Sequence, residues 1–166
     1  MSIIFKIIFI TLLFSSVSFA EELKKVGTFK DWEAIVVSNE GKKVCFAQSK
    51  PVLQSPKKNE RDARLFVTFR PSEKISDEVS TTSGYEYNNQ NSITAASGKS
   101  KYKFDIAQDN FAWISSNKIE KKVVKTMKRA SRLMVTGYNE SGSQTIDHYS
   151  LMGFSKAYSA AKKSCS

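Results

Sequence analysis

The spacing of apolar and polar residues near the C-terminus predicts two strands followed by a helix. Residues 133–138 are rich in strand-forming side chains, residues 139–142 form a polar turn cluster, and residues 143–151 resume β character. After Gly153, apolar residues recur at helical spacing, and lysines occupy the last turn, where positive charge suits the helix dipole. The apolar positions of this predicted C-terminal helix are Phe154, Ala157, Tyr158 and Ala161.

Earlier segments add further strands. Residues 31–37 and 44–48 flank a polar turn at 38–41, which is typical of a β-hairpin. Residues 64–70 are apolar on both faces, and this pattern predicts a strand in the middle of a sheet. Residues 51–62 are polar and proline-containing, so we expect an exposed loop there.

Between residues 101 and 130, the spacing of apolar residues changes from the two-residue period of a strand to the period of a helix. Residues 101–106 alternate between polar and apolar, which predicts a half-buried strand carrying Tyr102, Phe104 and Ile106. The aromatic run at 111–114 is expected in the core rather than on a binding platform. Residues 117–130 instead predict a helix, because apolar residues recur four apart. Eight to ten short strands with one internal and one C-terminal helix predict a mainly β protein, a β-sandwich.

The first 20 residues predict an export signal. Lys6 precedes an apolar segment at 7–14, and Ser18 and Ala20 are small residues at the positions that a signal peptidase reads. The alternative, an uncleaved anchor, is weakened by the shortness of the apolar run and the polar residues that follow it. We therefore expect cleavage near Ala20 and a single domain at 21–166 without a transmembrane segment. Its expected location is the periplasm, the outer envelope or the medium.

Positive charge is concentrated on the predicted internal helix. The chain has 26 Lys and Arg residues against 16 Asp and Glu residues, a net charge of +10, which becomes +9 once Lys6 leaves with the signal. Glu120 is the only acid among residues 118–132. The cations of this segment are Lys118, Lys121, Lys122, Lys125, Lys128, Arg129 and Arg132.

Such a face suits lipid phosphates or an acidic polysaccharide, at the bacterial envelope or on a host surface. The simpler interpretation is a solvated helix face that keeps the protein soluble. Nucleic acid is a poorer partner, because the compartment is wrong and the aromatic residues are not interleaved with the charges. The sequence does not indicate an oligomeric state.

Two cysteines in an exported chain allow one internal bridge, between Cys45 and Cys165. The alternatives are two free thiols or bridges between chains, although exported thiols rarely stay reduced. A metal site is not expected, because His148 is the only histidine and no Cys/His cluster has zinc spacing. Nothing in the sequence indicates a cofactor.

Catalytic motifs are weak. Residues 98–100 match the end of a phosphate-binding loop, but the first glycine of that motif is missing, so we interpret them as a turn. Asp147 and His148 could in principle pair as an orienting acid and a general base of a small periplasmic hydrolase. Adjacent strand residues point to opposite faces, however, so a structural role is favoured for both. We therefore expect no enzymatic activity, with this hydrolase as the alternative.

Three segments resemble the invasion-associated locus B family, exported proteins of alphaproteobacteria. Residues 29–32, with Asp31 and Trp32, are similar to the opening strand of the family, and residues 45–48 are similar to its cysteine strand. Residues 127–157 resemble its closing block, in which an Asp-x-Tyr-Ser-Leu-x-Gly-Phe run is typical. The matching residues here are Asp147, Tyr149, Ser150, Leu151, Gly153 and Phe154.

This resemblance implies an immunoglobulin-like β-sandwich in the periplasm or outer envelope, without a known catalytic activity and without a catalytic, cofactor or metal site. In pathogenic relatives, it implies an association with entry into host cells. The chain departs from many relatives in one respect, since Val36 and Val37 stand where a second cysteine of the first hairpin is common. A disulfide within that hairpin therefore cannot form, and Cys165 is the internal partner left for Cys45.

Overall fold

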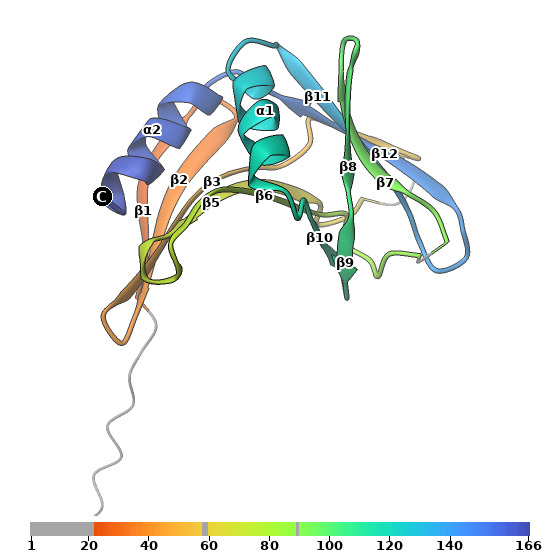
Figure 1. Cartoon of the computed structure of the whole chain (residues 1–166). Helices are drawn as coiled ribbons and strands as arrows, with labels where there is room; N and C mark the ends of the chain where they lie inside the picture. The colour runs from red at the N-terminus through yellow and green to blue at the C-terminus, as the bar shows by residue number, and fades with distance from the viewer. Residues whose placement is uncertain (1–21, 58–59, 89) are drawn as a thin grey trace, which may run out of the picture.

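The computed structural model describes residues 22–57, 60–88 and 90–166, and in these residues two antiparallel sheets form a sandwich (Figure 1). The predicted signal peptide lies outside the described residues. The first sheet has the strand order β1-β2-β3-β5-β6-β10-β9. Its strands are β1 (Glu22–Phe29), β2 (Trp32–Asn39), β3 (Lys42–Ser49), β5 (Arg64–Arg70), β6 (Ile75–Thr82), β9 (Ile106–Gln108) and β10 (Phe111–Trp113).

The second sheet has the order β4-β12-β11-β7-β8. Its strands are β4 (Leu53–Ser55), β7 (Ile93–Ser97), β8 (Ser100–Phe104), β11 (Arg132–Tyr138) and β12 (Gln144–Ser150). A short 3-10 helix, η1 (Pro71–Glu73), connects β5 to β6. The predicted β-sandwich with one internal and one C-terminal helix is confirmed, although the described residues contain twelve strands rather than eight to ten.

The two hairpins predicted from the sequence set the register of the sheets. In the first hairpin, Glu40 and Gly41 both have positive φ angles, as a two-residue type I′ turn requires. The second hairpin pairs β11 with β12 along their whole lengths. As predicted, β5 lies in the interior of its sheet, between β3 and β6.

Both helices cover the same side of the seven-stranded sheet, as Figure 1 shows. Helix α1 (Asn117–Met127) packs on β6 and β8, and α2 (Phe154–Ser164) packs on β1, β2, β3 and β5. Each helix inserts its apolar face into the core. The fully buried side chains of this core include Trp32, Leu65, Val67, Val123, Tyr149 and Phe154.

A disulfide joins Cys45 in β3 to Cys165 at the end of α2, as the sequence predicted. Cys45 is fully buried beneath α2, and the two Cα atoms are 5.9 Å apart. The bridge fixes the C-terminal helix to the central strands of the larger sheet. A covalent link of this kind is typical of proteins in oxidising compartments.

We expect one linked peptide pair when the exported protein is mapped without reduction. The protein should be denatured in an alkylating reagent, so that burial cannot protect a free thiol, then digested and examined by mass spectrometry. Neither Cys45 nor Cys165 should then be alkylated, and reduction before alkylation should modify both. Alkylation of both residues without reductant would contradict the bridge.

Two details of the sequence interpretation are wrong. Ile106 does not continue the strand of Tyr102 and Phe104; it begins β9 in the other sheet and is 46% exposed. The aromatic run at 111–114 lies only half in the core: Ala112 and Ile114 are buried in it, whereas Phe111 and Trp113 lie on the outer face of the sheet. The physical reason is strand alternation, which sends neighbouring residues to opposite faces.

Candidate functional site

The exposed face of α1 carries four of the cations that the sequence predicted, and the other three follow it: Lys128 is its C-cap, Arg129 lies in the next turn and Arg132 begins β11. Val123, Val124 and Met127 turn toward the core, and the lysines of this helix lie on the opposite, exposed side. All seven predicted cations are exposed. None of them forms an ion pair with another residue in the part of the chain that the structure describes.

Glu120, the single acid of this segment, does not neutralise that face. Its side chain points inward and is buried, and its Oε1 accepts a hydrogen bond of 2.9 Å from the backbone N–H of Val79 in β6. Desolvation raises the pKa of the Glu120 carboxyl above its usual value. Its carboxyl is therefore remote from the outer surface of α1.

Lys128 connects the two helices. Its Nζ lies 3.7 Å from the centroid of the Tyr158 ring of α2, within the range of a cation–π contact. The Tyr158 hydroxyl donates a hydrogen bond of 2.5 Å to Asp77 Oδ1, and burial and this bond raise the pKa of Tyr158. Lys162 of α2 approaches the same ring at 6.0 Å. The cationic surface thus continues from α1 onto α2, where Lys156 and Lys163 are also exposed.

A hollow of about 630 Å³ lies at the C-terminal end of α1. Its wall includes Ser97, Thr126, Arg129 and Arg132. Guanidinium groups bind phosphate oxygens through two parallel hydrogen bonds, so two arginines around one hollow suit a phosphate group. We define the cationic face of α1 as the seven predicted cations together with this hollow.

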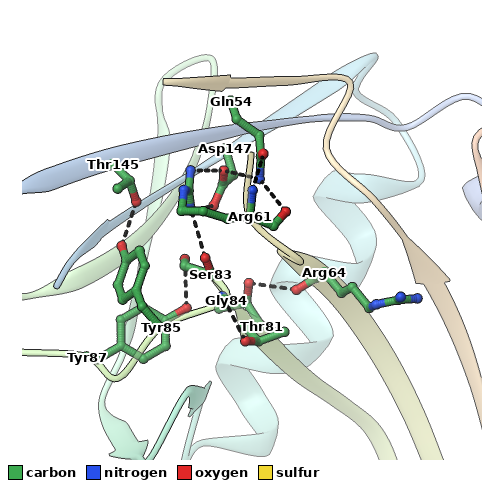
Figure 2. Close-up of polar contacts among 11 residues, drawn as sticks. Gln54, Arg61, Arg64, Thr81, Ser83, Gly84, Tyr85, Tyr87, Thr145 and Asp147 are labelled. Atoms are coloured by element: carbon green, nitrogen blue, oxygen red, sulfur yellow. Dashed lines mark hydrogen bonds and ion pairs between the residues drawn. The ribbon is translucent and has the colours of Figure 1, made fainter. Parts of the chain in front are cut away.

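Asp147 and His148 occupy opposite faces of β12. Asp147 is fully buried between the sheets, whereas His148 is only half-buried on the outer face of the five-stranded sheet. As Figure 2 shows, the Asp147 carboxylate is held by the Arg61 guanidinium. The Arg61 Nη2–Asp147 Oδ1 distance is 2.6 Å and the Arg61 Nη1–Asp147 Oδ2 distance is 3.1 Å. Asp147 therefore cannot orient His148, and the pair lacks the arrangement that a hydrolase would require.

Further hydrogen bonds extend the buried network around Arg61, whose Nε has no partner among the described residues. Its Nη1 donates to the carbonyl oxygen of Ser83 at 2.8 Å, and the Gln54 amide group contacts both the backbone of Arg61 and Asp147 (Figure 2). The guanidinium also lies 5.5 Å from the centroid of the Tyr85 ring. These contacts fasten β4 and the following loop to β12, so the network has a structural role.

Tyr149 is buried beside this network. Its hydroxyl makes no hydrogen bond to another described residue, and burial, with a further contribution from Asp147, raises its pKa well above the usual value. A tyrosine of this kind stays neutral and contributes mainly through the packing of its ring.

The family of the chain follows from a comparison with known protein families. The family described as Invasion associated locus B (IalB) protein matches residues 32–162, most of the chain. The chain belongs to the invasion-associated locus B family. No curated protein and no solved structure matches it. Proteins of the locus B family are exported, and the Cys45–Cys165 disulfide is consistent with a place outside the cytoplasm.

The opening and closing motifs of the locus B family contact each other through residues 31–32 and 150–154. Trp32 Nε1 donates to the carbonyl oxygen of Ser150 at 2.8 Å, and the Trp32 and Phe154 rings lie 4.8 Å apart in an edge-to-face arrangement. The backbone N–H of Asp31 bonds the carbonyl oxygen of Met152. Leu151 is buried nearby. The opening and closing motifs of the locus B family therefore form one structural joint in which α2 starts.

Other kinds of site find no support in the described residues. Within residues 22–57, 60–88 and 90–166, no group of three or more His, Cys, Asp or Glu side chains could hold a metal ion. None of the helices in this part of the locus B chain is long and apolar enough to cross a membrane.

Sequence reasoning missed two groups of residues. Arg61 was assigned to an exposed loop, although it pairs with Asp147 in the interior; a single cation between polar residues gives no pattern that signals burial. The outward aromatic residues Phe111 and Trp113 were assigned to the core. Strand alternation over 111–114 would have separated these two rings from Ala112 and Ile114.

Proposed function

We propose that this locus B protein is a non-catalytic binding module that docks on an anionic surface of the cell envelope through the cationic face of α1. It acts in the periplasm or at the outer envelope after its signal peptide has been removed. The observation that carries this proposal is the combination of seven exposed cations, free of ion pairs in the described residues, with the inward orientation of Glu120.

Energetics support a membrane surface as the ligand. A lysine near an anionic bilayer contributes up to about 1 kcal/mol, so several lysines on one helix face suffice for reversible attachment. The hollow beside Arg129 and Arg132 supplies a place for one lipid phosphate. In pathogenic relatives, the same type of face would serve at an anionic host surface.

The non-catalytic part of the proposal rests on the Asp147–His148 geometry. The carboxylate that would have to assist His148 is saturated by Arg61 and Gln54 on the far side of β12. His148→Ala should therefore leave the binding behaviour of the protein unchanged.

Reversing Lys121, Lys122 and Lys125 to glutamate should weaken binding to anionic vesicles by about tenfold or more. The three side chains are exposed, so the change replaces attraction by repulsion without disturbing the core. Binding should be measured by co-sedimentation with phosphatidylglycerol vesicles at low salt. Because ions screen exposed charges, the binding of the unaltered protein should itself fall as salt is added.

The matched control reverses Lys42, Lys43 and Lys57, which are also exposed but lie away from α1. This variant has the same net charge as the first and should keep most of the vesicle binding. Equal binding by both variants and the unaltered protein would refute the role of α1. An equal loss in both would show that net charge alone is responsible.

A further inference from the structure

Four aromatic side chains form a row on the outer face of the seven-stranded sheet. Strand alternation places Ala47, Leu65, Val67 and Ala112 toward the core and sends their neighbours outward. The outward row, which we call the aromatic stripe, consists of Phe46, Phe66, Phe111 and Trp113. Each of these rings is half-buried, and none belongs to the hydrophobic core. In Figure 1, both helices lie on the other side of this sheet.

The rings are evenly spaced. Successive centroids lie 5.9 Å apart from Phe46 to Phe66, 6.1 Å from Phe66 to Phe111, and 5.7 Å from Phe111 to Trp113. Phe66 reaches Phe111 across β6, because the β6 residues opposite these two rings, Ser80 and Thr82, are small. The stripe is therefore continuous over β3, β5, β6 and β10.

Charges around the aromatic stripe cancel in pairs. Lys25 bonds Glu33, which also accepts a hydrogen bond from Gln48. The Arg70 guanidinium binds both carboxylate oxygens of Glu78. Lys25 and Arg70 beside the stripe thus have acidic partners, as does Arg64 through Asp62, although the whole chain carries a net charge of +10. A ligand matched to it is uncharged, in contrast to the ligand of the α1 face.

Polar groups and a hollow accompany the rings. Thr68 and Ser80 lie on the same face as Phe66 but are largely covered, whereas Gln108 near the stripe is exposed. At the β9 end, the stripe borders a hollow of about 440 Å³ whose wall includes Trp113, Ile106 and Gln108. Aromatic rings with a few hydrogen-bonding groups beside a concave surface are typical of a small-ligand site.

We propose that the aromatic stripe binds an extended, uncharged glycan chain. Sugar rings stack their C–H faces on aromatic side chains and present hydroxyl groups at their rims, which suits a row of rings beside a hollow that carries the exposed amide of Gln108. The centroid spacing is comparable to the length of one sugar unit in an extended chain. Single-stranded nucleic acid is disfavoured as the occupant, because such sites require a positive groove and the cations next to the stripe in the described residues, Lys25, Arg64 and Arg70, are paired with acids. A second copy is disfavoured because two strongly cationic chains repel each other.

Fluorescence titration tests the proposal directly. The chain has two tryptophans, and Trp32 is fully buried beneath α2, so a glycan on the outer face reports through Trp113 alone. We expect at least one of the neutral probes cellohexaose, maltohexaose and chitohexaose to shift and saturate the tryptophan emission. No change in emission and no heat in calorimetry with any of the three at millimolar concentration would overturn the proposal.

Variants locate the site. Phe66→Thr should weaken the binding of the active probe, measured by calorimetry, by about tenfold or more, because it removes the central ring of the stripe. Trp113→Thr, nearer the sheet edge, provides a second test if the change at Phe66 destabilises the sheet. The control Met134→Thr removes an exposed side chain from the other sheet and should bind as the unaltered protein does. Equal binding by all of these proteins would refute the assignment to the stripe.

Two further outcomes separate this inference from the proposed function. The variant with Lys121, Lys122 and Lys125 reversed to glutamate should bind the neutral probe normally, since α1 lies on the other side of the sheet. A concentration-dependent dimer in light scattering that disappears in Phe66→Thr would identify a second copy as the occupant and overturn the glycan assignment.

Discussion

Gly153→Ala should destabilise the protein more than any other substitution considered for this chain, by about 4 kcal/mol or more in the free energy of unfolding. Gly153 has a φ angle of +94° where β12 passes into α2, and an added Cβ would lie 1.7 Å from the carbonyl oxygen of Phe29. That oxygen belongs to the backbone of β1, so no side-chain rotation can relieve the clash. The joint between Trp32 and Phe154 would have to open. Urea unfolding followed by near-ultraviolet circular dichroism, which reports on the environment of buried Trp32, measures the effect.

Gly41→Ala is the matched control. Gly41 also has a positive φ angle, of +78°, but nothing lies within 4 Å of its added Cβ. This variant should lose only the cost of a left-handed backbone, about 1–2 kcal/mol. If both variants unfold at the same urea concentration, close packing at Gly153 is not what holds α2 in place.

Asp147→Ala should lower the free energy of unfolding by about 3–5 kcal/mol, because it leaves the charge of Arg61 buried without a partner. The side chains of Arg61 and Asp147 are 9% and 1% exposed, so water cannot replace the lost carboxylate. Replacing both residues together, as Arg61→Met with Asp147→Leu, should recover most of the loss, since an apolar pair of similar volume leaves no buried charge. Chemical unfolding of the three proteins measures the difference.

Asp62→Ala is the control for charge removal as such. Asp62 pairs with Arg64 at 3.1 Å, but its side chain is 67% exposed, and an exposed pair of this kind contributes less than about 1 kcal/mol. A loss for Asp147→Ala no larger than that for Asp62→Ala would show that the buried network does not stabilise the sandwich.

Segments with a clear period were predicted well from the sequence. The hairpin at 31–48, the central strand at 64–70 and the hairpin at 133–151 all form, because each joins dense β-forming residues to a turn of suitable chemistry. Helix α1 was recognised by apolar residues four apart. Residues 98–100, interpreted as a turn, begin at the β7–β8 turn, where Gly98 has a positive φ angle.

Strands without an apolar face were missed. β1 was not predicted, because most of its residues are exposed at a sheet edge and its sequence carries no alternation. β4 contains three residues and lies at the edge of the other sheet, inside a segment interpreted as a loop. Both strands form because they pair with a neighbouring strand, and such tertiary pairing gives no local signal in the sequence.

The cationic face could be predicted from the sequence, whereas the aromatic stripe could not. The seven cations between residues 118 and 132 are visible in the sequence, and only the inward turn of Glu120 required the structure. The stripe collects rings from β3, β5 and β10, which are up to 67 positions apart between Phe46 and Trp113, so its continuity depends on strand order. An aromatic residue in a strand fits the core and the outer face equally well by composition alone.

The position of the disulfide also sets an order of events during biogenesis. The 120 positions that separate Cys45 from Cys165 contain strands β4 to β12 and both helices. Because the bridge needs both thiols on the oxidising side of the inner membrane, it closes only after all of that intervening chain has been translocated. In an exported chain, the Cys45–Cys165 bridge itself, rather than any other oxidation of Cys45, would therefore report that the intervening residues have passed through the export machinery.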